Sequence, residues 1–124
     1  MLVPRISKDD LKARLEGDAA MRPVILDVRL KYPYEHSTLT LSGAVRVAPD
    51  ALDIARLDRG RDIVAYDSDP DEVTSSHVAA QLIRQGFRAS ALKGGLPEWV
   101  AANFPVDTKD SARPAAPAPG ALKG

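Results

Sequence analysis

The sequence predicts an α/β fold, in which helices cover both faces of a small and mainly parallel sheet. Short apolar runs alternate along the chain with segments whose apolar residues recur at helical spacing. The runs at 24–28 and 63–66 are almost continuously apolar, which is typical of strands that are covered on both faces. The chain also has no internal repeat, so one domain of alternating helices and strands is the simplest architecture.

The first predicted helix begins after Ser7 and ends at Gly17. The Ser7 hydroxyl can cap the helix, and Asp10 stands at the third helical position, a variant of the capping box. Leu11 and Leu15 lie one turn apart and form the stripe that faces the core. Glycine is a common residue just past a helix end, so the boundary at Gly17 is well marked.

A strand is expected next at 24–28, with Asp27 as the one charged residue within it. A carboxylate in such a run needs partners, either backbone N–H groups or an arginine such as Arg29, so we expect both residues to be structural. Residues 32–36 read as a polar loop, and residues 45–47 as a short strand.

The second half of the chain continues the alternation. A short helix is expected with Asp50 as its cap, then a central strand at 63–66 and a helix that ends at Gln85. A last strand is expected at 89–92. A glycine turn follows it, and then a final helix over 96–102 with Pro97 at its first position.

The composition changes after residue 106. Residues 107–124 hold one leucine and no aromatic residue, and their middle is rich in proline and alanine. Such a segment buries too little apolar surface to offset the entropy lost on ordering. We therefore expect a domain at 1–106 and a disordered tail at 107–124.

The loop that joins strand 63–66 to the following helix is crowded with carboxylates, from Asp67, Asp69, Asp71 and Glu72. Ligands of parallel α/β domains usually bind where a strand ends and a helix begins, and a helix N-terminus favours anions. This loop supplies anions of its own. It is the candidate binding site, and it comprises Asp67, Ser68, Asp69, Pro70, Asp71, Glu72, Val73, Thr74 and Ser75.

Composition excludes several classes of function. The chain has no cysteine, which rules out disulfides and any mechanism that needs a protein thiolate, and two histidines cannot build a Cys/His zinc site. Its formal net charge is zero, so neither nucleic acid nor an anionic membrane is expected as a partner. No apolar run is long enough to span a bilayer or to form a signal peptide. We expect a cytoplasmic monomer without a cofactor.

Five fragments of the chain, in order, resemble the rhodanese family: ILDVR at 25–29, YEH at 34–36, LSGA at 41–44, IVAYD at 63–67 and LKGGLPEW at 92–99. The resemblance implies the rhodanese fold, a three-layer α/β/α arrangement. In the family's sulfurtransferases the position of Asp67 is held by the cysteine that carries sulfur. The loop is closest to a branch of the form YC.CPNEATSA, in which Asp69 would replace a second cysteine.

The resemblance therefore implies a rhodanese-like domain that lacks its catalytic residue, and we expect no sulfurtransferase activity. The favoured function is a binding or regulatory module whose loop recognises an unknown protein or a basic peptide. Two interpretations of Asp67 stay open: its carboxylate fills the N–H cradle at the helix start, or it is an exposed loop residue.

Two further functions stay open. An enzyme of different chemistry would use Asp67 as nucleophile or base, although no orienting partner for Ser75 and His77 is evident in the sequence. Alternatively, the acidic loop would bind a divalent cation, because its start resembles an EF-hand. The EF-hand pattern then fails, with Glu72 in place of the glycine and Val78 in place of the last glutamate.

Overall fold

The computed structural model describes residues 3–68 and 72–109. Its centre is a parallel sheet of five strands in the order β1-β6-β5-β2-β4. These strands are β1 (Arg5–Ile6), β2 (Val24–Asp27), β4 (Val45–Arg46), β5 (Ile63–Tyr66) and β6 (Ala89–Leu92). Strand β5 is central, because it pairs with β2 on one side and with β6 on the other.

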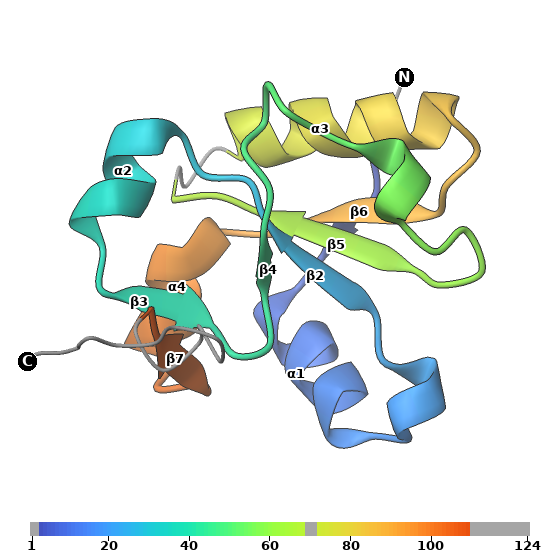
Figure 1. Ribbon diagram of the computed structural model, residues 1–124. Helices are drawn as coiled ribbons and strands as arrows, with labels where there is room; N and C mark the ends of the chain where they lie inside the picture. Colours follow the sequence, from blue (N-terminus) through green and yellow to red (C-terminus); the bar gives the residue numbers. More distant parts are fainter. Residues whose placement is uncertain (1–2, 69–71, 110–124) are drawn as a thin grey trace, which may run out of the picture.

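Helices cover both faces of this sheet (Figure 1). Helix α3 lies along one face, and α1 and α4 lie on the other; α2 stands at the side of the sheet, near β4. The α-helices are α1 (Lys8–Glu16), α2 (Lys31–His36), α3 (Val73–Arg84) and α4 (Gly95–Ala101), and there are 3-10 helices at Ala19–Met21 and Ile54–Arg56. The predicted three-layer α/β/α fold with a mainly parallel sheet is confirmed.

The alternation of side chains along the strands divides the core into two clusters. Leu26, Ile63 and Ala65 face α3 and pack against buried residues of that helix, such as Leu82. On the other face, Ile25, Val64 and Tyr66 pack with residues of α1 and α4 that include Leu11, Leu96 and Trp99. Because β2 and β5 are apolar on both faces, they can only be interior strands, as their sequence indicates.

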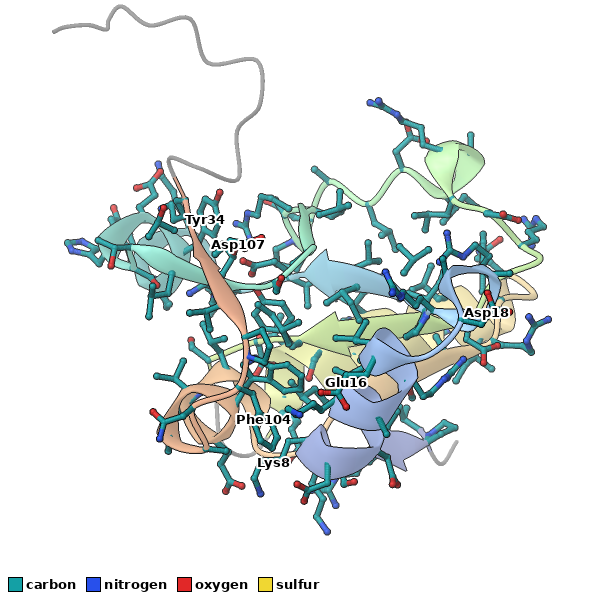
Figure 2. All side chains as sticks on the ribbon, turned by 90° about the horizontal axis from the view of Figure 1, so that it is seen from below. Lys8, Glu16, Asp18, Tyr34, Phe104 and Asp107 are labelled. Carbon is teal, nitrogen blue, oxygen red and sulfur yellow. The ribbon has the colours of Figure 1, made fainter. Side chains whose placement is uncertain are left out.

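A small antiparallel ribbon closes the α1/α4 side of the molecule. It consists of β3 (Leu39–Leu41) and β7 (Val106–Thr108), paired from Leu39–Thr108 to Leu41–Val106. Phe104 lies between α1 and α4 (Figure 2), with its ring 5.1 Å from that of Trp99 in an edge-to-face contact. The predicted domain boundary at residue 106 is therefore wrong, because β7 brings Asp107 and Thr108 into the fold. Residues 110–124 of the expected tail lie outside the described part.

Several local predictions need correction. Residues 32–36, expected as a polar loop, belong to helix α2, where Pro33 is tolerated because first-turn amides have no helical partner. The helix expected from Asp50 is instead a 3-10 turn capped by Asp53, whose carboxylate accepts a hydrogen bond from the Ala55 N–H. In the last helix Pro97 is the third residue, not the first. No helix among the described residues combines the length and apolar character that a bilayer crossing requires.

Candidate functional site: the loop after strand β5

Asp67 follows β5 directly and turns its side chain back toward helix α3. The carboxylate accepts a hydrogen bond from the Ser75 N–H at 2.6 Å, and the residue is only 2 % exposed. Ser75 is the third residue of α3, so its N–H belongs to the first turn, where amides lack a helical acceptor. A carboxylate at this place is stabilised by the hydrogen bond and by the helix dipole. The carbonyl of Asp67 also accepts from the Leu96 N–H at 2.9 Å, which ties the loop to α4.

Glu72, at the other end of the loop, is held by an arginine from the first strand. Its backbone is left-handed (φ 58°), and its carboxylate is buried. The Arg5 guanidinium donates to both carboxylate oxygens, at 2.5 and 2.8 Å, and the Gly94 N–H donates at 3.1 Å. The hydrogen bonds from Arg5, with a smaller contribution from Gly94, hold the pKa of Glu72 below its ordinary value. These contacts compensate a backbone conformation that is unfavourable for a residue with a side chain.

The interpretation of Asp67 as an exposed loop residue is therefore wrong, and two of the four carboxylates of the loop are buried. Asp67 and Glu72 are both 2 % exposed, and both are bound to groups of the protein. Asp69, Pro70 and Asp71 lie outside the described residues. Of the other predicted loop residues, Val73 is exposed, Ser68 and Thr74 are half-buried, and Ser75 is buried.

The described residues do not support the two other hypotheses for this loop, a divalent-cation site and an enzyme of different chemistry. Over residues 3–68 and 72–109, no group of three or more metal-binding side chains is placed to hold an ion. The Ser75 hydroxyl is buried and donates weakly to the Glu72 carbonyl at 3.4 Å, while His77 lies exposed on the outer side of α3. The pair therefore does not resemble a nucleophile and its base.

A second buried charge cluster stands beside the loop, at the end of β2. Asp27 accepts from the Arg29 guanidinium at 2.7 Å and from the Tyr66 hydroxyl at 2.9 Å. Arg29 also donates to the Leu39 carbonyl at 3.0 Å, so it joins the end of β2 to β3, as expected of a structural residue. Burial and the neighbouring Asp27 charge raise the pKa of Tyr66, which therefore stays protonated.

A groove of about 630 Å³ opens beside the start of α3, between the first turns of α2 and α3 and the segment after β4. Two of the most exposed large apolar side chains of the described chain, Leu30 at 55 % and Val73 at 64 %, border it. Its charged lining consists of Lys31, Arg46 and Asp50, and His77 adds a polar ring. We call this surface the α3 groove. The sequence did not reveal it, because its residues come from three separate segments, at 30–31, 46–50 and 73–81.

Comparison with known proteins identifies the family. A model of the rhodanese-like domain matches residues 7–102. The solution structure of a rhodanese-like domain from Anabaena sp is 31 % identical, with a TM-score of 0.72, and the match covers 94 % of this chain and 88 % of that one. A full-length protein from Lactobacillus plantarum is 27 % identical with a TM-score of 0.76, over 84 % of this chain and 87 % of that one.

A rhodanese-like domain protein from Staphylococcus aureus is 21 % identical with a TM-score of 0.67, over 77 % of this chain and 90 % of that one, which shows the shared fold. No match to this chain was found among curated proteins. The chain belongs to the rhodanese-like domain family, and it is a member without cysteine.

Proposed function

We propose that this domain is a binding or regulatory module that does not transfer sulfur. The observation that carries the proposal is the carboxylate of Asp67, buried against the Ser75 N–H at 2.6 Å. By family resemblance, Asp67 stands where sulfurtransferases have the cysteine. A carboxylate cannot form a persulfide, and the chain has no cysteine that could take over this role.

The position of the Asp67 side chain also works against the binding of an anionic substrate. An amide of the first turn of α3, which would otherwise attract an anion, already has a negatively charged acceptor. A second anion would meet this charge at short range in a site with little solvent. Burial and this hydrogen bond likewise disfavour Asp67 as a nucleophile or base, because its oxygens are neither exposed nor free.

We place the recognition surface in the α3 groove, next to the loop. Leu30 and Val73 offer apolar contact area there, which suits a protein segment with an apolar anchor residue. The basic peptide expected from the sequence is less favoured by the described groove, where Asp50 is outnumbered by Lys31 and Arg46. Its attraction to the module depends on Asp69 and Asp71, which are not described.

A sulfurtransferase assay with thiosulfate and cyanide tests the proposal. We expect no turnover above the uncatalysed background from the natural sequence, and turnover would refute the proposed function. The variant Asp67→Cys asks whether the amides of α3 still support a persulfide. The matched control is Ser68→Cys, which places the same thiol one residue further along the loop.

Turnover by Asp67→Cys but not by Ser68→Cys would show that the family's cradle remains and that only the sulfur carrier was lost. Absence of turnover in both would show that the amides at the start of α3 no longer support a persulfide. Recognition by the α3 groove is tested separately. A double change of Leu30 and Val73 to serine should abolish binding of a physiological partner while the fold, monitored by circular dichroism, is retained.

A further inference from the structure

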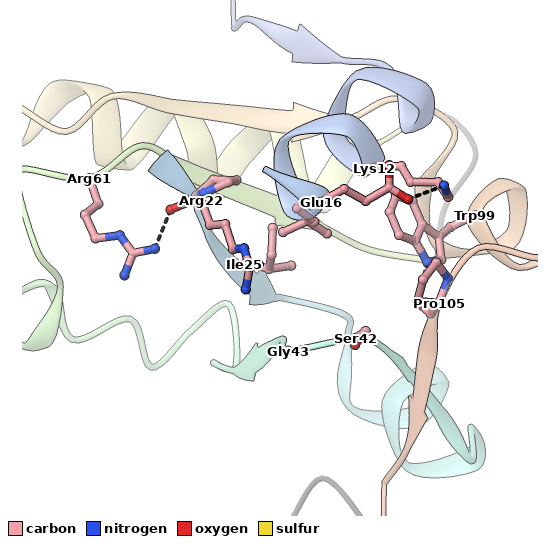
Figure 3. Close-up of a pocket in the computed structure, with 11 residues that line it drawn as sticks. Lys12, Glu16, Arg22, Ile25, Ser42, Gly43, Arg61, Trp99 and Pro105 are labelled. Carbon is pink, nitrogen blue, oxygen red and sulfur yellow. Dashed lines mark hydrogen bonds and ion pairs between the residues drawn. The ribbon is translucent and has the colours of Figure 1, made fainter. Parts of the chain in front are cut away.

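A separate pocket of about 320 Å³ lies on the α1/α4 side of the sheet (Figure 3). It is bounded by α1, by the start of β2, by the turn that joins β3 to β4, and by the segment that follows α4. Ile25 and Trp99, both buried, form its inner walls, and Leu15, Pro23 and Pro105 add apolar surface. None of these residues belongs to the loop or to the α3 groove, so the pocket is a second site. We call it the Trp99 pocket.

The charges around the Trp99 pocket are unevenly distributed. At one side Lys12 and Glu16 form an ion pair at 2.5 Å and neutralise each other. At the other side stand Arg22 and Arg61, with their side chains on the same flank of Ile25 (Figure 3). The carboxylate nearest to Arg61 in sequence, that of Asp62, is bound to two other arginines and does not neutralise this side.

The two arginines are positioned by the backbone and keep donor capacity. The Arg22 Nε donates to the Gly17 carbonyl at 3.3 Å, and an Arg61 Nη donates to the Arg22 carbonyl. Both acceptors are neutral carbonyls, so these contacts do not neutralise the positive charge of either arginine. The Arg61 Nε is buried without a hydrogen-bond partner in the described structure, and an unsatisfied buried donor of this kind calls for an acceptor.

We propose that the Trp99 pocket binds a small aromatic or aliphatic carboxylate. The apolar part of the ligand lies against Ile25 and Trp99, and its carboxylate accepts hydrogen bonds from Arg22 and Arg61. Arginine suits this task because its planar group donates two parallel hydrogen bonds to a carboxylate. The volume is at the lower end of the range of about 300–1,000 Å³ for small-molecule sites, which limits the ligand to roughly one ring and a short chain.

The chain contains a single tryptophan, so Trp99 reports on its own pocket. The test is a titration of the isotope-labelled full chain with 3-phenylpropionate, followed by amide and indole N–H resonances. The matched ligand is 3-phenylpropionamide, which has the same ring and chain but no charge. We expect the carboxylate to shift the Trp99 indole and Ile25 resonances, and the amide to bind about tenfold more weakly, as loss of a charged hydrogen bond predicts.

Variants distinguish binding of the carboxylate in this pocket from its general attraction to a positively charged side chain. Arg22→Gln should weaken binding of 3-phenylpropionate about tenfold. Arg84→Gln, a change of an exposed arginine on the helix that covers the opposite face of the sheet, should leave it unchanged.

Four results would overturn the proposal. They are no resonance shifts at millimolar 3-phenylpropionate, equal binding of 3-phenylpropionamide, shifts centred outside the pocket, or equal weakening of binding by Arg22→Gln and Arg84→Gln. The spectrum itself shows whether each variant is folded, and Arg22→Lys provides a second variant that keeps the charge but loses the planar group.

Discussion

Replacement of Asp67 by asparagine tests the central feature of the site, because it keeps the shape of the side chain and removes its charge. In the wild type the charged oxygen accepts the Ser75 N–H at 2.6 Å, inside a site that is 2 % exposed. Hydrogen bonds to charged groups contribute about 1.5–3 kcal/mol, and neutral ones about 0.5–1.5 kcal/mol. A charge at a partly buried helix N-terminus adds up to about 2 kcal/mol, which overlaps with the hydrogen bond.

We therefore expect Asp67→Asn to lower the free energy of unfolding by about 1–2 kcal/mol. For a domain of this size, such a loss lowers the melting temperature by roughly 4–9 °C. Thermal and urea denaturation at neutral pH, followed by circular dichroism, measure both quantities. Asp50→Asn, at an exposed aspartate of the α3 groove, controls for the change in net charge and should shift stability by less than about 0.5 kcal/mol.

An Asp67→Asn variant that is as stable as the wild type, or more stable, would refute the reasoning. It would mean that the cost of burying the carboxylate equals or exceeds what its hydrogen bond and the helix dipole return. The chain would then tolerate Asp67 at this position without depending on it for stability.

Three further changes test the surroundings of the loop. Glu72→Gln should cost about 1–2 kcal/mol at pH 7 by weakening the contact to Arg5. Because the pKa of Glu72 lies below its ordinary value of 4.5, its contribution is complete above that value and is lost as the pH falls through the lower, folded value. The two proteins should therefore converge in urea unfolding at acid pH, and a constant gap would contradict this. Tyr66→Phe should cost about 1–3 kcal/mol, because buried Asp27 and a buried main-chain N–H each lose a partner; an unchanged denaturation midpoint would exclude this role. Gly94→Ala should cost about 1–2 kcal/mol, because Gly94 has φ +80°, and a neutral effect on melting would show that the turn relaxes.

The sequence predicted those parts of the fold whose local pattern and final environment agree. Helix α1 has its cap at Ser7 and its buried residue at Leu11, as predicted, and the Asp10 N–H donates to the Ser7 hydroxyl at 3.1 Å. Strands β2, β5 and β6 are also found at their predicted places, because runs of apolar residues fit only strands covered on both faces.

The missed elements are those that long-range pairing creates. Strands β1, β3 and β7 have two or three residues each, which is too short for a periodic signal. β1 is a strand because it pairs with β6, and β3 and β7 are strands because they pair with each other. Helix α2 was missed because its N-cap, Leu30, makes no side-chain capping bond, and Pro33 is usually a sign of a turn.

The candidate site shows the same limit. The sequence identified the acidic loop but could not tell which carboxylates turn inward, because their partners are distant. Glu72 is bound by an arginine 67 positions earlier. The capping of α3 by Asp67 was one of two open interpretations. The α3 groove and the Trp99 pocket gave no local signal, since each is assembled from several separate segments.

The contact between Arg5 and Glu72 also couples the loop after β5 to the first strand of the sheet. Arg5 belongs to β1, a two-residue edge strand that is held to the sheet by β6 alone, so β1 can detach at a small cost, as can the other edge strand, β4. If β1 detaches, Glu72 loses its main counter-charge and the loop keeps its contacts to Gly94, Leu96 and α3, while the rest of the sheet stays intact. A pulling force on the amino end, or another strand that displaces β1, would therefore weaken the contacts of the loop after β5, on the far side of β6.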